Sequence, residues 1–308
     1  MKNIIQVNNL CKTYSSFFRR KKSPALENLT LSVPEGVVFG FLGPNGAGKT
    51  TTIRLLMDLI KPSAGTALIL GKPPTDIKTK MQIGFLPDAP AFSSYLSANE
   101  FLTICAKLLK IPKETRKKRI EEVLDIVNMT QHAKSKLGSF SRGMVQRIGI
   151  AQAILNNPKL LILDEPLVGL DPHGRQELKD IIMHEKKNGA TIFFCSHILS
   201  DVEKICDHLG ILNQGKLLCS GKVDDLLSET GLRVHIDAGH DDLTQSVITD
   251  ATGSLKLPDG GWELTFPQNK EISEKVASLR EKNPDCVTLT PSRESLEDFF
   301  FRKIESVK

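Results

Sequence analysis

A glycine-rich stretch that ends in lysine and threonine has the composition of a phosphate-binding loop. Residues 41–56 read FLGPNGAGKTTTIRLL. Because glycine has no side chain, successive backbone N–H groups in such a stretch can turn inward and form a nest for an anion. The spacing over residues 43–50 matches the Walker A pattern, in which Lys49 reaches the β- and γ-phosphates and the Thr50 hydroxyl holds Mg²⁺. The pattern predicts that the chain binds a nucleoside triphosphate; a glycine-rich turn without a ligand is the alternative.

The segments on either side of the loop are those that such a site needs. Residues 37–42 form a short apolar run that predicts a buried strand. Residues 51–57 have helical spacing, so the positive N-terminal end of a helix would face the phosphates. The predicted nucleotide contacts are Gly43, Pro44, Asn45, Gly46, Ala47, Gly48, Lys49, Thr50 and Thr51.

Two adjacent acidic residues end a second apolar segment. Residues 160–163 predict a buried strand, and Asp164 and Glu165 follow at its carboxyl end, where open α/β sheets hold their ligands. This is the Walker B arrangement, in which Asp164 would hold hydrated Mg²⁺ and Glu165 would polarise the attacking water as general base. A simple turn with two acidic residues is the alternative.

A histidine ends a third apolar segment. Residues 188–196 read NGATIFFCS, and His197 follows at the same edge of the predicted sheet. Its Nε2 could donate a hydrogen bond to the γ-phosphate and orient the water, so we expect a catalytic role for it. A histidine with a purely structural role is the alternative.

A second anion-binding feature precedes the acidic pair. Residues 140–147 read FSRGMVQR, and Ser141 is a good N-cap for an amphipathic helix over residues 142–155. The Ser141 hydroxyl, the Gly143 amide and the helix dipole would together attract a negative charge. The chain therefore has a second predicted phosphate site besides the glycine-rich loop.

The order of these motifs resembles that in the ATPase subunits of ATP-binding-cassette (ABC) transporters. The chain also carries GLDP at residues 169–172, and the whole set spans about residues 5–225. In residues 140–147, the resemblance to the family's signature motif holds at Ser141 and Gly143, while phenylalanine, arginine and methionine replace leucine, glycine and glutamine. The stretch SLEDFF at residues 295–300 resembles the tails of such subunits in small bacterial drug and antibiotic export systems.

The resemblance implies that two cassettes share each ATP. In the family, the signature motif of one subunit faces the γ-phosphate held by a second subunit, which can be identical or different. The residues expected to make this contact are Ser141, Arg142, Gly143 and Met144. Asp171, in the D-loop, would communicate across the same junction.

The resemblance also implies ATP and Mg²⁺ as cofactors. Tyr14 matches the aromatic residue that stacks on adenine, and an ordinary tyrosine at a strand end is the alternative. Asp88 stands where the family usually has glutamine as a Mg²⁺ ligand. It is the weaker metal candidate beside Thr50 and Asp164, because its charge would repel the γ-phosphate.

Apolar runs that alternate with helical segments predict a mainly parallel sheet covered by helices. With the resemblance, this implies an α/β P-loop NTPase of ABC type over residues 1–228, with an antiparallel β subdomain and a helical subdomain inserted at about residues 88–157. Residues 229–308 are expected to form a small α+β accessory domain, because residues 255–266 have the alternation and turn of a hairpin. A final helix is expected after a Ser292 cap.

The composition fits a globular chain without a membrane anchor. Of its 308 residues, 40% are hydrophobic, yet no run approaches the roughly 20 apolar residues that cross a bilayer. Six cysteines without a CxxC pair indicate neither a zinc site nor a disulfide framework. The net charge of +5 does not predict nucleic-acid binding, and the basic residues 19–22 are either a solvated loop or a contact to anionic lipids.

We therefore expect an ATP-binding and ATP-hydrolysing subunit that energises transport, and specifically export, through separate membrane-spanning subunits. It would lie in the cytoplasm, on the cytosolic face of the membrane, and residues 89–102 with Tyr95 would receive a helix of the membrane partner. No nucleic-acid partner is expected. A soluble ABC ATPase acting on ribosomes or DNA is the alternative, which the single cassette and the lack of sustained heptads disfavour. An unrelated P-loop kinase is disfavoured by the signature motif and by His197.

Overall fold

The computed structural model describes residues 2–14, 24–227, 229–267 and 270–306. The chain divides into two compact units, Met1–Val223 and Asp224–Lys308. The expected boundary between residues 228 and 229 lies slightly further along the chain, at the start of strand β10 (Glu229–Ile236). The basic residues 19–22 fall outside the described residues.

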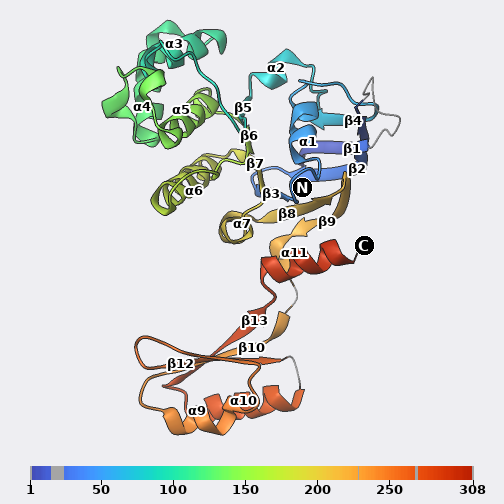
Figure 1. Ribbon diagram of the computed structural model, residues 1–308, viewed down its shortest axis with the longest axis vertical. Coiled ribbons are helices and arrows are strands. Elements are labelled where there is room, and N and C mark those ends of the chain that lie inside the picture. The colour runs from blue at the N-terminus through green and yellow to red at the C-terminus, as the bar shows by residue number, and fades with distance from the viewer. Residues whose placement is uncertain (1, 15–23, 228, 268–269, 307–308) are drawn as a thin grey trace. The chain divides into compact units, whose positions relative to one another are not determined.

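A six-stranded sheet forms the centre of the first unit (Figure 1). Its strands lie in the order β5-β6-β7-β3-β8-β9, and all neighbours are parallel except β8 and β9. Strands β3, β6 and β7 are buried along their whole length, as expected for parallel strands covered on both faces. The strands are β3 (Val38–Leu42), β5 (Ile83–Leu86), β6 (Leu160–Asp164), β7 (Thr191–Ser196), β8 (His208–Asn213) and β9 (Lys216–Lys222). The predicted mainly parallel sheet is confirmed.

A smaller antiparallel sheet packs against the first one through a shared apolar core. It consists of β1 (Asn3–Thr13), β2 (Pro24–Pro34) and β4 (Ala64–Ile69), in the order β2-β1-β4. Helix α1 (Lys49–Leu56) contributes Ile53 to the same core, in which Phe39 and Phe193 stack with ring centroids 5.6 Å apart. The α1 helix begins slightly before the expected start at residue 51.

The helices inserted between β5 and β6 occupy the interval of the expected helical subdomain. They are α3 (Ala98–Leu108), α4 (Lys113–Ile126) and α5 (Arg142–Ile154), and they lie together in Figure 1. A capping box of Ser97 and Glu100 begins α3. Helices α2 (Ile77–Lys80), α6 (Pro172–Lys187) and α7 (Leu199–Ile205) lie elsewhere in the first unit, and α8 (Val223–Leu226) lies at the boundary.

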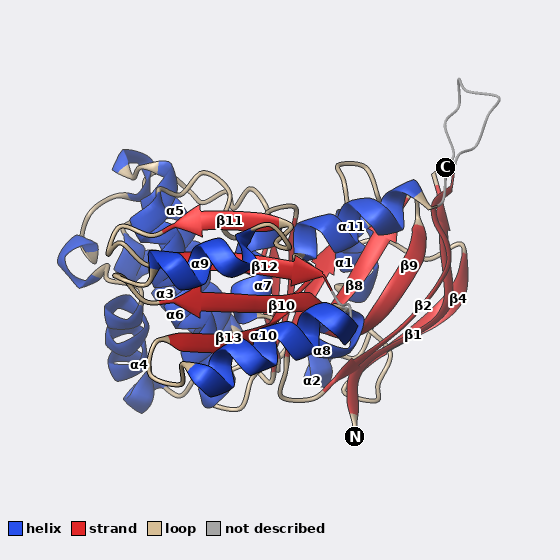
Figure 2. Cartoon of the chain, turned by 90° about the horizontal axis from the view of Figure 1, so that it is seen from below, coloured by secondary structure: helices blue, strands red, loops and turns tan. Residues whose placement is uncertain are grey.

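The second unit has the βαββαβ order of a ferredoxin-like fold. Its antiparallel sheet has the order β11-β12-β10-β13, and Figures 1 and 2 show α9 and α10 on the same face of it. The further elements are α9 (Asp241–Ile248), β11 (Gly253–Lys256), β12 (Trp262–Pro267), α10 (Lys270–Lys282), β13 (Val287–Arg293) and α11 (Leu296–Glu305). Strands β11 and β12 form the predicted hairpin, with Lys256 paired to Trp262.

The expected cap of the last helix is wrong by three positions. Ser292 lies inside β13, whereas Ser295 caps α11 by accepting a hydrogen bond from the Asp298 amide at 3.1 Å. Both serines precede a helical pattern, and the strand continues past the first because β13 pairs with β10 as far as Arg293. Among the described residues, no helix has the length and apolar character needed to cross a bilayer.

Candidate active site

The loop between β3 and α1 has a backbone that requires glycine. Gly46 and Gly48 have φ angles of +80° and +113°, which residues with a side chain rarely adopt. A Cβ atom at Gly43 would lie 2.3 Å from the carbonyl oxygen of Leu212 on β8, so the loop can lie this close to the sheet only with glycine there. Lys49 begins α1 directly after the loop, which places the N-terminus of that helix beside it.

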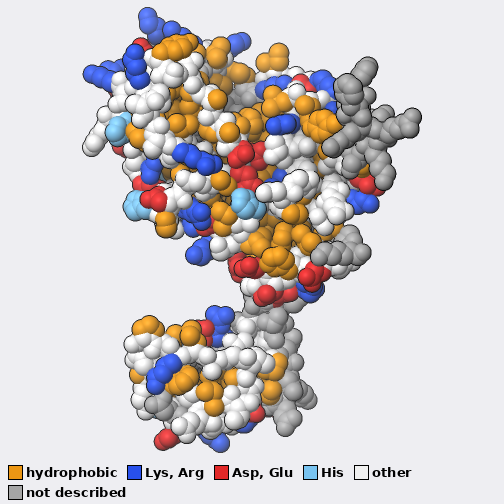
Figure 3. Space-filling view, in the orientation of Figure 1, with side chains coloured by type: hydrophobic (Ala, Val, Ile, Leu, Met, Phe, Trp, Pro, Cys, Tyr) orange, Lys and Arg blue, Asp and Glu red, His pale blue; other side chains and the backbone are white. Residues whose placement is uncertain are grey.

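A pocket with a volume of about 220 Å³ lies over this loop. It is lined by Ala25, Pro44, Asn45, Gly46, Ala47, Gly48, Lys49, Thr50, Thr51, Asp88 and Glu165. Figure 3 shows acidic side chains beside a histidine on the surface of the first unit, over the strands that Figure 1 labels β6 and β7. The pocket thus joins the glycine-rich loop to acidic residues from two other parts of the chain.

Lys49 is buried among oxygen atoms. Its Nζ donates hydrogen bonds to the carbonyl oxygens of Gly43 at 2.7 Å and Pro44 at 3.4 Å. It also lies 3.4 Å from Oε1 of Glu165. Gly43, a predicted nucleotide contact, does not line the pocket but holds this ammonium group through its carbonyl oxygen. A cation with only 6% of its surface exposed is therefore fixed at the wall of the pocket, where an anion would meet it.

Asp164 is the last residue of β6, and one of its carboxylate oxygens can accept a further hydrogen bond or bind a metal ion. It is 2% exposed and forms a hydrogen bond with the Thr50 side chain. Its Oδ1 is buried and lacks a hydrogen-bond partner within the described part of the chain. Burial raises the pKa of Asp164 to about 6, and the carboxylates of Asp88 and Glu165 add to this, while the Thr50 hydrogen bond acts in the opposite direction.

These groups fit a magnesium ion. A buried carboxylate oxygen without a partner, next to a hydroxyl, is a donor set that Mg²⁺ prefers, because this ion uses one or two carboxylates and keeps several waters. No cluster of three or more histidine, cysteine or acidic side chains among the described residues could hold a metal by itself. The remaining ligands would have to be water and phosphate oxygens.

Glu165 connects the loop lysine to the histidine. Its Oε2 lies 2.9 Å from Nδ1 of His197, and its Oε1 faces Lys49. Its backbone has φ +50°, a strained conformation for a residue with a long side chain, and its amide donates to the Cys195 carbonyl oxygen at 3.1 Å. Because β6, β7 and β3 are parallel neighbours, their carboxyl ends meet and bring these three side chains together.

Tyr14 and Asp88 lie at the rim of the same region. The Tyr14 hydroxyl is 3.5 Å from Oγ1 of Thr51, and Nζ of Lys12 lies 5.2 Å from the centroid of the ring. The ring is 46% exposed beside the start of α1, which leaves a surface for a planar group. Asp88 follows β5, is exposed and lines the pocket.

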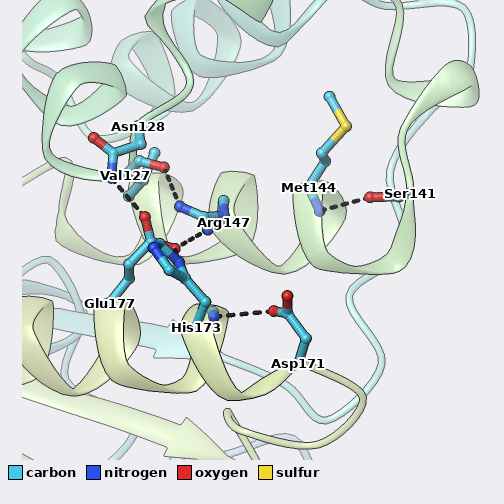
Figure 4. A network of polar contacts seen from close by, with 9 residues as sticks. Val127, Asn128, Ser141, Met144, Arg147, Asp171, His173 and Glu177 are labelled. Atoms are coloured by element: carbon cyan, nitrogen blue, oxygen red, sulfur yellow. Dashed lines mark hydrogen bonds and ion pairs between the residues drawn. The ribbon is translucent and has the colours of Figure 1, made fainter.

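The signature residues lie apart from this pocket. Ser141 caps α5 by accepting a hydrogen bond from the Met144 amide at 3.3 Å (Figure 4). The described residues that line the loop pocket include none of residues 141–144. Asp171 caps α6 in a similar way, because its Oδ1 accepts a hydrogen bond from the Gly174 amide at 2.9 Å. The two predicted phosphate sites of the chain are therefore separate.

A network of polar contacts behind the signature residues is not evident from the sequence. Arg147 on α5 forms an ion pair with Glu177 on α6 (Figure 4). The side-chain amide of Gln146, also on α5, donates a hydrogen bond to the Pro166 carbonyl oxygen at 2.9 Å. The spacing of His173 and Glu177 on one helix face signals a local pair, whose atoms Nδ1 and Oε2 lie 3.2 Å apart. No local pattern shows that Arg147 would join them.

Comparison with known protein sequences places the chain in a family. A family model described as ABC transporter matches residues 26–168. An uncharacterized ABC transporter ATP-binding protein of Nostoc sp. (strain PCC 7120) is 40% identical, and the match covers 98% of this chain and 90% of that protein. The bacitracin transport ATP-binding protein BcrA of Bacillus licheniformis is 37% identical, with 99% of this chain and 98% of that protein covered.

Solved structures resemble about seven tenths of the chain. One described as the ATP-binding subunit of an ABC transporter has a TM-score of 0.66 and 30% identity, and the match covers 72% of this chain and 91% of that one. The cassette MJ0796, in a dimeric post-hydrolysis state with bound ADP and Pi, has a TM-score of 0.65 and 25% identity, with 71% of this chain and 98% of that one covered.

Proposed function

The chain belongs to the ABC transporter family of ATP-binding proteins, and from this premise we propose how its residues divide the work of an ATPase. The loop pocket binds the triphosphate of ATP, and the ring of Tyr14 stacks on adenine. The observation that carries the proposal is the position of Glu165 between Lys49 and His197 in one pocket. Contacts with Lys49 and His197 fix the Glu165 carboxylate, and its backbone is strained, so the side chain is preorganised to act on a bound substrate.

In this proposal, Glu165 accepts a proton from the attacking water while His197 holds the carboxylate in place through Nδ1. Nε2 of the same ring is then directed toward the γ-phosphate. Lys49 and the loop amides neutralise the charge that develops on the phosphate oxygens. When bound, Mg²⁺ would add to this neutralisation, with Thr50 and Asp164 as its ligands and Asp88 as the weaker candidate.

The Ser141 tip of α5 acts on ATP that a second cassette holds. This follows because a capped helix N-terminus attracts phosphate but lies outside the pocket of its own chain. The likeness to a dimeric cassette with ADP and Pi supports such a pair. Ser141, Arg142, Gly143 and Met144 would form the contact, with Asp171 beside them, in a dimer of identical or different subunits.

The work of hydrolysis is passed to separate membrane-spanning subunits. The match to the bacitracin transport protein extends over nearly the whole chain, and a 36% identical relative from Bacillus subtilis is named for linearmycin resistance. We therefore propose export of an antibiotic-like cargo, by a subunit bound to the cytosolic face of the membrane. In residues 89–102, the Tyr95 side chain is 70% exposed, and the rings of Phe92 and Phe101 pack with their centroids 4.5 Å apart. An exposed aromatic side chain beside a packed aromatic pair suits a docking surface for a partner helix.

The first test is the Glu165→Gln variant of the full chain. It should lose roughly 10²-fold or more in the rate of ATP hydrolysis but keep its ATP affinity, because the amide keeps the shape and loses the base. In gel filtration with ATP and Mg²⁺, the same variant should elute as a dimer. Glu121, exposed on α4, supplies the matched control: its glutamine variant should hydrolyse ATP at the parent rate. Unchanged turnover of the Glu165→Gln variant would remove the residue from the role of base.

A second test separates the transporter from the soluble alternative. The tagged chain, purified from detergent-solubilised membranes, should retain a polytopic membrane protein. Substitution of the exposed Tyr95 by aspartate should release that protein and leave the basal ATPase rate unchanged. Recovery with ribosomes or DNA in place of a membrane protein would support the soluble alternative.

A further inference from the structure

The carboxylate of Glu177 on α6 is a junction between three helices (Figure 4). Its Oε2 pairs with Arg147 on α5, and its Oε1 accepts a hydrogen bond from Nδ2 of Asn128 at 2.9 Å. Asn128 follows the C-terminal end of α4. His173, one turn before Glu177 on α6, lies 3.2 Å from the same carboxylate. One acidic side chain thus ties α6 to both neighbouring helices of the inserted subdomain.

The partner arginine strengthens this junction. Nη1 of Arg147 donates to the Val127 carbonyl oxygen at 3.2 Å, which is one of the free carbonyls at the end of α4. The side chains of Arg147 and Glu177 are 23% and 21% exposed, so solvent screens their attraction less than at an open surface. The hydrogen bond from Arg147 also lowers the pKa of Glu177, which keeps this carboxylate charged.

Further contacts join the first turns of α5 to the loop before α6. A Cβ atom at Gly169, which has φ +78°, would lie 2.6 Å from Nε of Arg142, so the arginine side chain packs directly on this glycine. The Gln146 amide holds the Pro166 carbonyl oxygen, one residue beyond Glu165. The helix tip that carries Ser141 is therefore connected to the loop that carries the proposed base.

We infer that Glu177 is a positioning residue that holds the Ser141 tip of α5 at the angle needed to grip ATP on a second cassette. The inference rests on the proposed function, since it requires the shared ATP. Physically, α5 and α6 act as one body because the charge of Glu177 fixes Arg147, while Gln146 and Arg142 fix the intervening loop. Loss of that charge leaves Arg147 without its carboxylate partner and lets the helix tip tilt.

The test is the Glu177→Gln substitution in the full-length Glu165→Gln protein, in which ATP is bound and not consumed. Two quantities are measured: the affinity for a fluorescent ATP analogue in the monomer, and the dissociation constant of the ATP-dependent dimer by analytical ultracentrifugation. We expect the dimer to weaken about 10-fold while the nucleotide affinity stays the same. Glu121→Gln is the matched control, because Glu121 forms an exposed ion pair with Lys117 on α4 and should change neither quantity.

A double-mutant cycle separates positioning from general stability. If Glu177 acts through the helix tip, then Glu177→Gln should weaken the dimer little further once Ser141→Ala has removed the cap. Additive losses, an unchanged dimer, or an equal loss of nucleotide affinity would each overturn the role of Glu177. If the Glu165→Gln parent itself did not form a dimer with ATP, the proposed function would fail first, and the role of Glu177 would fail with it.

Discussion

Replacing Asp164 with asparagine should make the chain more stable in the absence of magnesium and nucleotide. The wild-type carboxylate is 2% exposed and its Oδ1 has no hydrogen-bond partner in the described part of the chain. An asparagine side chain has the same shape, carries no charge and can still accept the hydrogen bond from Thr50. The substitution therefore removes the cost of burying a charge without leaving a cavity.

The size of this effect follows from the pKa. Burial raises the pKa of Asp164 from 3.8 to about 6, so the folded chain binds the proton more tightly than the unfolded chain. The free energy of unfolding then falls as the pH rises from about 4 to about 6, and it stays at the lower level above that range. Because a tenfold change in proton affinity corresponds to about 1.4 kcal/mol, the ionised carboxylate costs about 3 kcal/mol near pH 7.

Thermal unfolding in EDTA measures this cost. Near pH 7.5, the Asp164→Asn variant should unfold roughly 6–12 °C above the wild type, as about 3 kcal/mol implies for a unit of this size. Near pH 5 the difference should be roughly half as large, and near pH 4 it should be roughly a fifth as large. Asp125→Asn is the matched control, because Asp125 is exposed on α4 and its substitution should leave the unfolding temperature unchanged.

Adding ATP together with Mg²⁺ should reverse the order. The nucleotide supplies the phosphate ligands of the ion, and the pair should stabilise the wild type more than the variant, because the variant lacks the carboxylate ligand. An Asp164→Asn variant that is less stable than the wild type in EDTA near pH 7.5 would refute the reasoning. A stabilisation that does not depend on pH would also refute it, since the cost could not then come from ionisation.

The other predictions concern the rim of the pocket. The Asp88→Gln variant should keep or raise the rate of ATP hydrolysis in a steady-state assay, because an amide does not repel the γ-phosphate as a carboxylate does; a collapse of the rate would make Asp88 an essential ligand. The Tyr14→Ala variant should bind ATP about 10-fold more weakly in a fluorescence titration, whereas Tyr14→Phe should bind normally, because stacking needs the ring and not the hydroxyl. Equal affinities of the two Tyr14 variants would argue against stacking.

Much of the site follows from short-range information in the sequence. The glycines of residues 43–48 are needed for positive φ angles and close backbone approach, and those needs are visible as residue types at fixed spacing. In the same way, the apolar segments that end at Asp164 and His197 predict strands whose carboxyl ends carry polar groups. The Ser141 cap of α5 is likewise local, because a cap acts within one helical turn.

Other features depend on which elements become neighbours in three dimensions. Glu165 meets both Lys49 and His197 because β6, β7 and β3 are adjacent in the sheet, an order that no local pattern contains. The raised pKa of Asp164 arises from burial by the surrounding chain.

The position of the C-terminal helix cap also depends on such neighbours. Ser292 and Ser295 are equally good caps by residue type, and the pairing of β13 with β10 leaves only Ser295 free to begin a helix. The pairing of Arg147 with Glu177 cannot be predicted from the sequence either, because charged residues on two helices have many possible partners and only helix packing selects one. Residue types thus set the local chemistry of this chain, and the packing of its strands and helices sets which groups act together, because contacts between distant segments depend on the whole fold.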